Sequence, residues 1–510
     1  MTRFLGTETE YGIVAPSHAA LSPIITSTHL VVAFGMAKRC ATGARWDFAS
    51  EHPLRDTRGF DLRRYQSTPV IDPSAIGMAN VVLTNGGRFY VDHAHPEYSS
   101  PETTNAFDAM LYDCAGDVIL SSACAQVAHF SALNHSVLDN HQPCPALKIY
   151  KNNVDGKGAS YGAHENYFYR KDIDFDAIAR GLIPFFVTRQ VIIGAGRVGK
   201  GVSGQESGFQ ISQRADYIEQ EISLETTLNR GIINTRDEPH TTADRFGRLH
   251  VIIGDANMSQ IAIFLKLGMT SLVLDAIEAG VDFSDLQLKD AVAEVKNVSY
   301  DLGLKHALAL ADGRSLTALE ILWHYHQRVN PQTQVDRRVH QLWAEVLELL
   351  AQGPHKAAHM LDWCAKYSLL ESFAQRGVSV HSAKAQLIDL QYSDIDPQKS
   401  LYHALVHKGR MQQLVSAQDI SAAAWTPPQD TRAYFRGTMA DTFGSSILAA
   451  NWDSLSTRCG NHDVRISFPG LADFTAQKTK HYFDSFGQDQ LEQLLQALSE
   501  DMPNDALEWL

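Results

Sequence analysis

Alternation of polar and apolar residues marks several short stretches of the chain as strands with one buried face. The clearest is residues 87–100, GRFYVDHAHPEYSS, which we expect to begin as a strand and to end in a turn at Pro96. The apolar residues Phe89 and Val91 share the face that suits a core. The opposite face carries three polar residues, with Glu97 just beyond them: Arg88, Tyr90 and Asp92.

Three other stretches carry pairs of polar residues two positions apart, which places each pair on one face of a strand. These pairs are Glu8 and Glu10, His164 and Asn166, and Arg248 and His250. For any single pair, a solvated strand face is the better explanation. If one sheet holds all four strands, however, the polar residues would line a common cavity. Carboxylates with imidazoles suit Mg²⁺ or Mn²⁺ and arginines suit phosphate, so the combined pattern favours a metal–nucleotide site.

Helical patterns fill much of the rest of the chain. We expect helices over residues 27–38 and 105–139, and a mostly helical region over residues 256–380. The clearest helix runs from Asp336, which could cap it, to Leu350, with Gly353 closing it. The six cysteines are scattered and form no Cys-x-x-Cys pair, so neither a zinc site nor a disulfide framework is indicated.

The pair Pro427-Pro428 suggests a domain boundary. After it, residues 431–436 and 463–468 alternate as strands do, and residues 491–498 have the period of a helix. The sequence therefore predicts a large first domain over residues 1–427 and a small C-terminal domain over residues 428–510.

Residues 39–79 interleave arginines with carboxylates and contain few aliphatic residues. A connection of about 40 residues is long, and such loops are usually functional or disordered. We expect a mobile surface loop here, which is also what a lid over a site would require.

The glycine-rich segment 191–201, VIIGAGRVGKG, partly matches two nucleotide-binding patterns. A P-loop would need Ser or Thr after Lys200, where this chain has Gly201. A dinucleotide fingerprint would have to open a helix, but strand-like residues 209–212 follow. We therefore expect a flexible loop near the mouth of the site, and neither of the two nucleotide folds.

Composition narrows the function further. The chain has 510 residues, of which 44% are apolar and 20% are charged, and its net charge is −14. That charge argues against nucleic-acid binding, which needs a basic face. The chain has no uninterrupted apolar run of about 18 residues, so no membrane span is predicted. Glu8 and Glu10 stand where a signal peptide would be apolar, so we expect a cytoplasmic protein.

The chain also carries five longer motifs: GTETEYG at 6–12, YVDHAHPEYSS at 90–100, HENY at 164–167, LHVIIGDAN at 249–257 and DTRAYFRG at 430–437. These motifs resemble the deamidase/depupylase family of prokaryotic ubiquitin-like protein (Pup), which is related to the Pup ligase and to glutamine synthetase. The resemblance implies an α+β fold in which helices pack an antiparallel sheet cradle, followed by a small C-terminal α/β domain. Residues 45–48 and 53–56 resemble the insertion that separates the deamidase from the ligase.

The resemblance also implies cofactors, partners and residue roles. ATP, or ADP with phosphate, would bind with Mg²⁺ as a cofactor that is not spent on each turnover. The implied nucleotide contacts are Arg88, Ser100, Asn166 and Arg248. The implied metal ligands are Glu8, Tyr90, Glu97, His164 and His250, with Glu10 as a further candidate. Asp92 would be the catalytic residue, as either a nucleophile or a base. The implied partners are Pup and pupylated proteins, with the proteasome as a further candidate.

Two alternatives stay open at this point. A Pup ligase would share the metal and nucleotide residues, although the charged insertion and the DHAHPE form of the motif favour a hydrolase. A catalytically silent, nucleotide-dependent Pup-binding protein is the alternative from another class. The presence of Asp92 with all the implied ligands speaks against it. Whether deamidation or depupylation predominates depends on whether Pup ends in Gln or Glu.

Overall fold

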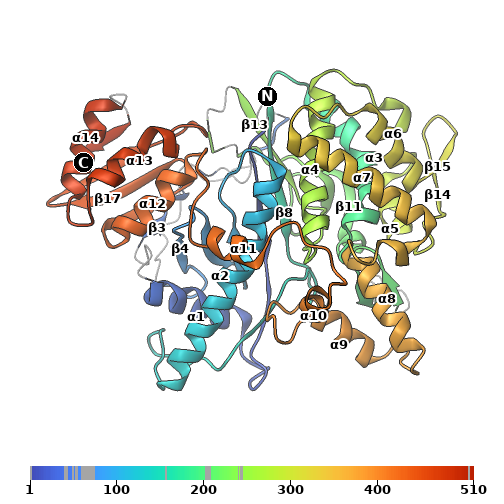
Figure 1. The fold of residues 1–510 in the computed structure, drawn as a ribbon, viewed down its shortest axis with the longest axis horizontal. Helices are drawn as coiled ribbons and strands as arrows, with labels where there is room; N and C mark the ends of the chain where they lie inside the picture. The colour runs from blue at the N-terminus through green and yellow to red at the C-terminus, as the bar shows by residue number, and fades with distance from the viewer. Residues whose placement is uncertain are drawn as a thin grey trace.

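A six-stranded antiparallel sheet, in the order β13-β8-β1-β6-β5-β4, forms the centre of the protein (Figure 1). The structure is a computed structural model, and it describes residues 3–38, 44–48, 51, 55–58, 75–155, 158–200, 208–238, 240–241, 245–502 and 506–509. The strands of the central sheet are Leu5–Glu10 (β1), Asn80–Val82 (β4), Arg88–Asp92 (β5), His95–Ser99 (β6), Ala163–Arg170 (β8) and Phe246–Val251 (β13).

Strands β5 and β6 form a tight hairpin, which corrects the predicted turn at Pro96. Only His93 and Ala94 separate the two strands, and His93 has a φ of 52°, as the favoured two-residue hairpin turns require. Pro96 lies within β6 opposite Val91, and its carbonyl oxygen accepts a hydrogen bond from the backbone N–H of Tyr11 at 3.0 Å. Asp92 therefore ends β5 directly beside the turn.

Two helices, Pro23–Lys38 (α1) and Ala106–Ala132 (α2), cover the apolar face of the β6-β5-β4 half of the sheet. The predicted strand face is buried there, since Phe89 and Val91 pack in one core with residues of both helices. Helix α2 begins after Asn105, whose side-chain oxygen accepts hydrogen bonds from the N–H groups of Phe107 and Asp108 at 3.0 Å.

A larger helical core packs against β8 and β13 on the other side of the molecule (Figure 1). Its helices are Phe175–Ile193 (α3), Gln260–Glu278 (α4), Ala291–Tyr300 (α5), Ala318–Arg328 (α6) and Gln334–Gln352 (α7). Helix α7 is capped by Thr333, and Asp336 is the third helical residue, which completes a capping box with Thr333. The predicted cap at Asp336 is thus wrong by three positions, while Gly353 does close the helix.

Helix α4 is long and apolar enough to cross a membrane by length and composition, although charged residues interrupt its apolar sequence. Its 18-residue apolar window has a mean hydropathy of 1.6, and 89% of that window is buried inside the protein. Such burial is that of a core helix, since residues such as Phe264 and Leu265 are inaccessible to solvent. Among the described residues no other helix passes this test.

Shorter elements surround these cores. Four further helices are Asp362–Ala374 (α8), Ala383–Tyr392 (α9), Leu401–His407 (α10) and Ala417–Ala423 (α11). Two-stranded sheets pair Gly12–Val14 (β2) with Lys148–Tyr150 (β7), Ile218–Ser223 (β11) with Arg230–Asn234 (β12), and Ala307–Ala309 (β14) with Ser315–Thr317 (β15). The described cysteines, Cys114, Cys124, Cys144, Cys364 and Cys459, are free.

The glycine-rich segment after α3 forms neither nucleotide fold. Arg197–Gly199 (β9) pairs with Gly208–Gln210 (β10) as an antiparallel hairpin, so no helix opens on these glycines. The segment from Gly194 to Val198 is buried, which corrects the predicted flexible loop over that part. Residues 201–207 lie outside the described residues.

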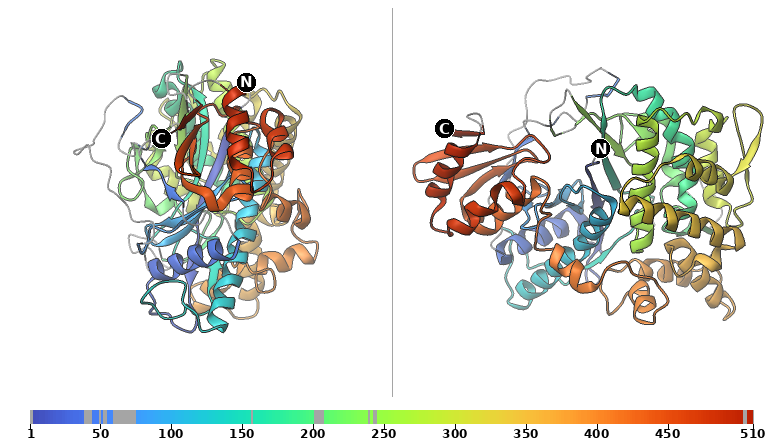
Figure 2. Two further views of the ribbon diagram at one scale, coloured as in Figure 1. Left: turned by 90° about the vertical axis from the view of Figure 1, so that its left-hand side faces the viewer. Right: turned by 45° about the horizontal axis from the view of Figure 1, so that its top comes forward.

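The C-terminal region forms a second sheet with its own core, set to one side of the central sheet (Figure 2). The sheet order is β19-β18-β17-β16-β3, with strands Leu507–Trp509 (β19), His462–Ser467 (β18), Ser454–Cys459 (β17), Ile447–Ala450 (β16) and Arg45–Trp46 (β3). The helices are Ala433–Phe443 (α12), Ala476–Ser485 (α13) and Leu491–Asp501 (α14). Strand β3 comes from the charged insertion and pairs with β16. One strand of the C-terminal sheet therefore lies before the predicted domain boundary at 427/428.

Helix α12 replaces the strand that was predicted over residues 431–436, and a buried ion-pair cluster accounts for the difference. Arg432 and Arg436 are four residues apart, so a helix brings both guanidinium groups to one carboxylate, Glu102. Arg432 Nε donates to Glu102 Oε1 at 2.8 Å, and Arg436 Nε donates to the carbonyl oxygen of Gly86 at 2.8 Å. This cluster joins the C-terminal region to the central sheet.

Glu102 should also make the stability of the protein depend on pH. Burial opposes the charge of this carboxylate, but Arg436 and Arg432 outweigh burial and lower its pKa from 4.5 to about 2. A lowered pKa adds stability above the unfolded-state value, and that stability is lost as the pH falls from about 4.5 towards about 2.

We predict that Glu102→Gln lowers the free energy of unfolding at pH 7 by roughly 3 kcal/mol, because it leaves two buried arginines without their anion. Urea denaturation at pH 7 and pH 4 measures the effect. The free energy of unfolding should change less between pH 7 and pH 4 in the variant than in the parent. The control Asp463→Asn, which removes the exposed pair with Arg458, should cost under about 1 kcal/mol. Equal effects of the two substitutions would contradict the structural role of Glu102.

Candidate active site

The register of the central sheet brings the predicted polar residues to one face. Across the β1–β8 ladder Glu8 pairs with His164, and across the β1–β6 ladder Glu10 pairs with Glu97. His250 pairs with Asn166, and Tyr90 pairs with Glu97. Side chains alternate along each strand, so residues two positions before or after a paired residue lie on the same face of the sheet. The four stretches that share a polar pattern in the sequence therefore line one surface.

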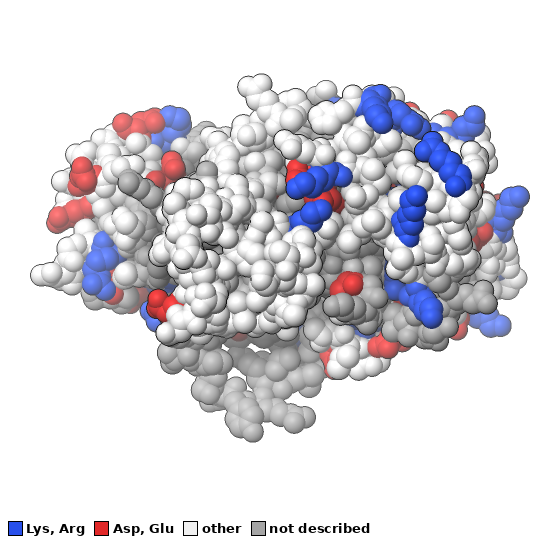
Figure 3. Space-filling view, turned by 90° about the horizontal axis from the view of Figure 1, so that it is seen from below, with Lys and Arg blue, Asp and Glu red and all other residues white. Residues whose placement is uncertain are grey.

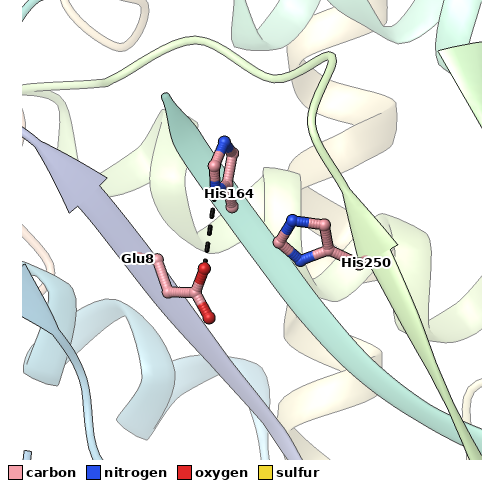
Figure 4. A group of neighbouring side chains, drawn as sticks. All are labelled: Glu8, His164 and His250. Carbon is pink, nitrogen blue, oxygen red and sulfur yellow. Dashed lines mark hydrogen bonds and ion pairs between the residues drawn. The ribbon is translucent and has the colours of Figure 1, made fainter. Parts of the chain in front are cut away.

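The first group on this surface comprises Glu8, His164 and His250 (Figure 4). One ligand atom from each of these residues lies within 4.8 Å of the others. His164 Nδ1 lies 3.4 Å from Glu8 Oε2, and Asn166 donates a hydrogen bond to Glu8 Oε1 at 3.0 Å. The Asn166 carbonyl oxygen accepts from Arg248 at 3.2 Å and lies 3.0 Å from His250 Nδ1. This network requires the proton of His250 on Nδ1.

The other nitrogen of His250 is suited to a metal ion. Within the described part of the chain, His250 Nε2 is buried and has no hydrogen-bond partner. Burial and the neighbouring His164 and Arg248 lower the pKa of His250 well below its ordinary value, which keeps the ring neutral. A neutral imidazole whose second nitrogen is held by a hydrogen bond is the usual form of a metal-binding histidine. Because His250 Nε2 is buried without a partner among the described residues, it is free to bind a metal ion, and this observation supports a cation at the group of Glu8, His164 and His250.

Glu8 supplies the anionic member of the same group. Burial opposes its ionisation, but the hydrogen bond with His164 and the positive charge of Arg248 keep its pKa well below the ordinary value. Glu8 is therefore a carboxylate flanked by two imidazoles, a mixture of oxygen and nitrogen donors that suits a divalent cation.

The second group comprises Glu10, Asp92 and Glu97, whose carboxylate oxygens also lie within 4.8 Å of one another. Glu10 Oε1 accepts a hydrogen bond from the backbone N–H of Gly162 at 2.8 Å. A side chain at Gly162 would collide with both Glu10 and His164, so only glycine allows this approach. Burial and the charges of Asp92, Glu10 and Glu8 raise the pKa of Glu97 well above its ordinary value. Hard oxygen donors crowded without a cation form a site suited to Mg²⁺.

Tyr90 and Arg88 extend this face along β5. The Tyr90 hydroxyl lies 3.3 Å from Ser99 Oγ and hydrogen-bonds with Glu97. The Arg88 guanidinium lies between two rings, 3.7 Å from the centroid of Tyr90 and 3.9 Å from that of Trp46. Trp46 comes from the charged insertion. Part of that insertion therefore covers Arg88, which the family resemblance implies as a phosphate contact.

Asp92 is the most accessible carboxylate of the second group, with 39% of its side chain exposed. Partial burial opposes its charge, but the hydrogen bond with His93 at 3.0 Å and the charges of His93, His164 and Arg88 lower its pKa. An ionised, accessible carboxylate at the end of β5 is placed to meet a substrate that approaches from solvent.

A cavity of about 60 Å³ lies beside the first group. Three of the predicted nucleotide contacts, Ser100, Asn166 and Arg248, line it together with Glu8. Arg88 does not line it and lies on the far side of Tyr90. Sequence reasoning missed four lining residues: Glu102, His240, Arg432 and Trp452. Arg432 lay inside a quoted motif, but the other three carried no periodic signal because loops and the C-terminal region supply them.

A model of the Pup-ligase protein family matches residues 3–456 of this chain. The chain belongs to the Pup-ligase protein family. It is 49% identical over 489 residues to the "Pup deamidase/depupylase" of Mycolicibacterium smegmatis, covering 94% of this chain and 96% of that relative. This similarity confirms the family that the motifs suggested.

Two solved structures in this family have the same fold. The complex of Pup with its ligase PafA superposes with a TM-score of 0.76 at 28% identity, covering 99% of this chain and 96% of that one. The ligase PafA in complex with ADP gives a TM-score of 0.72 at 28% identity, covering 87% and 98%. These matches confirm the predicted α+β fold, in which helices pack an antiparallel sheet.

The crowding of carboxylates generates a prediction about stability. Replacing Glu97 by Gln removes one charge from a group whose oxygens lie within 4.8 Å of one another. We predict that Glu97→Gln raises the melting temperature without metal and lowers the gain in melting temperature that Mg²⁺ and ATP provide. Thermal unfolding with and without Mg²⁺–ATP measures both. The exposed Glu221→Gln is the control and should change neither. An unchanged gain in the Glu97 variant would exclude Glu97 as a ligand.

Proposed function

We propose that this chain is a Pup deamidase/depupylase. It hydrolyses the side-chain amide at the C-terminus of Pup, which deamidates a terminal Gln or cleaves the isopeptide bond between Pup and a target lysine. Both are one reaction with different leaving amines. The observation that carries this proposal is the accessible, ionised Asp92 at the centre of a site in a chain 49% identical to a "Pup deamidase/depupylase".

A nucleotide cofactor is part of the proposal. ADP is bound in the PafA structure, which superposes on 87% of this chain. Here a cavity lined by Ser100, Asn166 and Arg248 offers a hydroxyl, an amide and a guanidinium, which are the donors that phosphate oxygens accept from. Trp452 also lines this cavity and adds an aromatic side chain to its wall.

Mg²⁺ is the second part of the cofactor. The residues that would hold it are the two groups on the sheet face: Glu8, His164 and His250, and Glu10 and Glu97 with Tyr90 beside them. When bound, Mg²⁺ would neutralise the crowded carboxylates and polarise an oxygen of the substrate. The protein fixes these ligands in advance through Asn166 and the Gly162 N–H.

Asp92 acts on the amide carbon in one of two ways. As a nucleophile, its carboxylate oxygen bonds to the carbon, the amine leaves with a proton, and water then cleaves the acyl–aspartate. As a base, Asp92 takes a proton from a water that attacks the same carbon. Both routes give a carboxylate and a free amine. In both, His93 holds the Asp92 carboxylate in its ionised form through their hydrogen bond.

The Pup ligase is the nearest alternative, because its fold and sheet are shared. Identity to the "Pup--protein ligase" of Pseudarthrobacter chlorophenolicus is 38% over 70% of this chain, compared with 49% over 94% of this chain to the deamidase/depupylase, which favours the hydrolase. The insertion also favours it, since its described part places Trp46 over Arg88 at the edge of the site. A silent Pup-binding protein would have no need for an ionised Asp92.

We predict that Asp92→Asn lowers the rate of Pup hydrolysis at least about 100-fold and leaves nucleotide affinity within about threefold. The substitution keeps the shape of the side chain and removes its charge. Release of ammonia from Pup ending in Gln measures the rate, and calorimetry measures ATP affinity. His93→Gln is the companion variant and should shift the acidic limb of the pH–rate profile upward, because loss of the hydrogen bond raises the pKa of Asp92. Wild-type hydrolysis by Asp92→Asn would exclude the assignment.

A second experiment separates the hydrolase from the ligase. Amide formation in water is uphill and must consume ATP, whereas hydrolysis runs downhill and needs the nucleotide only to complete the site. We predict that the protein releases Pup from a conjugate while consuming far less than one ATP per bond cleaved. With Pup ending in Glu and a lysine-bearing target, it should form little conjugate. ADP release in step with conjugate formation would identify a ligase.

A further inference from the structure

A second cavity lies far along the chain from the catalytic strands, in the helical region around α8 and α10. It has a volume of about 320 Å³ and opens to solvent. Its walls come from α8, from the turn after the 3-10 helix Pro354–Ala357 (η4), and from the segment that follows α10. None of the residues of the catalytic face lines it.

The polar part of this cavity consists of side chains that donate hydrogen bonds. The polar lining residues are His355, His359, Ser368, Ser372 and Arg410, and the described lining contains no carboxylate. His355 is already engaged, since its ring nitrogens lie 3.1 Å from Ser368 Oγ and 3.1 Å from Glu371. Within the described residues, the side chains of Arg410, His359 and Ser372 have no hydrogen-bond or ion-pair partner. Arg410 and His359 are exposed and Ser372 is half-buried, so these three donors line a cavity that is open to solvent.

The backbone around the cavity fixes where Arg410 stands. Helix α10 ends in a turn at Gly409, whose φ of 64° favours glycine, and the N–H of Arg410 donates to the carbonyl oxygen of Leu405 at 2.9 Å. Two residues later, the N–H of Gln412 donates to the carbonyl oxygen of His359 at 2.8 Å. This last bond ties the segment that carries Arg410 to the turn that carries His359.

The surroundings of the cavity are basic, although the whole chain has a net charge of −14. Lys356, Arg376 and Lys408 are exposed on the same elements. Figure 3 shows the molecule from below, where several Lys and Arg side chains and some Asp and Glu side chains lie over the right-hand part. A locally positive surface on an acidic protein attracts anions to that place.

We propose that this cavity binds a small organic phosphate. Arg410, His359 and Ser372 would hold the phosphate group, and the apolar floor of Leu369 and Leu405 would hold the organic part. Three free donors from separate elements match the three terminal oxygens of a phosphate monoester, whereas a carboxylate has only two oxygens. The site is independent of the proposed hydrolysis, because it shares no lining residue with the catalytic face.

Calorimetric titration of the full chain with phenyl phosphate, in Mg²⁺ and one equivalent of ADP to occupy the catalytic site without an excess of free nucleotide, tests this proposal. We expect one saturable site. Arg410→Gln should weaken binding at least tenfold, and Arg376→Gln, an exposed arginine at the end of α8 outside the cavity, should stay within twofold of the parent. Inorganic phosphate and benzoate should each bind at least fivefold more weakly than phenyl phosphate.

Two controls keep the result interpretable. If Arg410→Gln does not fold, His359→Gln should show the same weakening of phenyl phosphate binding. Both variants should keep the parent's rate of Pup hydrolysis. The absence of saturable binding, or equal affinity in the parent and both variants, would overturn the site. Benzoate binding as tightly as phenyl phosphate would overturn its assignment to phosphate.

Discussion

The gathering of four carboxylates on one face of a sheet is the constraint on which the rest of this structure depends. Glu8, Glu10, Asp92 and Glu97 stand on three adjacent strands, where their charges repel one another and burial penalises them. Such an arrangement is stable only if other interactions hold the strands in register. The apolar face of the same strands supplies them, because Phe89, Val91, Tyr167 and Leu249 are all buried beneath the site. The helical cores therefore support a face that would not assemble by itself.

The sequence could predict which residues share this face, but not which of them touch. A period of two residues is a local property, so the pairs Glu8–Glu10 and His164–Asn166 were visible without a structure. The register between strands depends on residues far apart in the chain and cannot be predicted from a local pattern. The contact of Glu8 with His164 and the unpartnered Nε2 of His250 were therefore found only in the structure. The ligand roles implied by the family resemblance stay predictions.

The errors have physical causes of the same kind. Residues 431–436 alternate in polarity and were predicted as a strand, but a partner distant in the chain, Glu102, selects the helix that presents Arg432 and Arg436 together. Helix α4 was not recognised as continuous apolar sequence because isolated charged residues interrupt it. One of these, Lys266, is buried and donates to the carbonyl oxygen of Asp255 at 3.0 Å. Tertiary contacts outweighed local pattern in both cases.

The charged insertion shows how a hydrolase and a ligase could share one sheet. Residues 39–43, 49–50, 52–54 and 59–74 lie outside the described residues, so the predicted mobile lid stays a prediction. The described parts are anchored on both sides. Strand β3 joins the C-terminal sheet beside β16, and Asp56 accepts a hydrogen bond from Thr235 at 2.6 Å, next to β12.

The described parts of the insertion thus contact the C-terminal sheet at β3 and the residues after β12 at Asp56, and Trp46 lies over Arg88 at the edge of the polar sheet face. Ligation must consume ATP and also needs a lysine amine to reach the carbon, whereas hydrolysis needs only water to reach it. A segment fixed at both flanks of that face determines the space through which an amine must approach. Selection between hydrolysis and ligation can therefore lie in access to the sheet, while the carboxylates themselves stay unchanged.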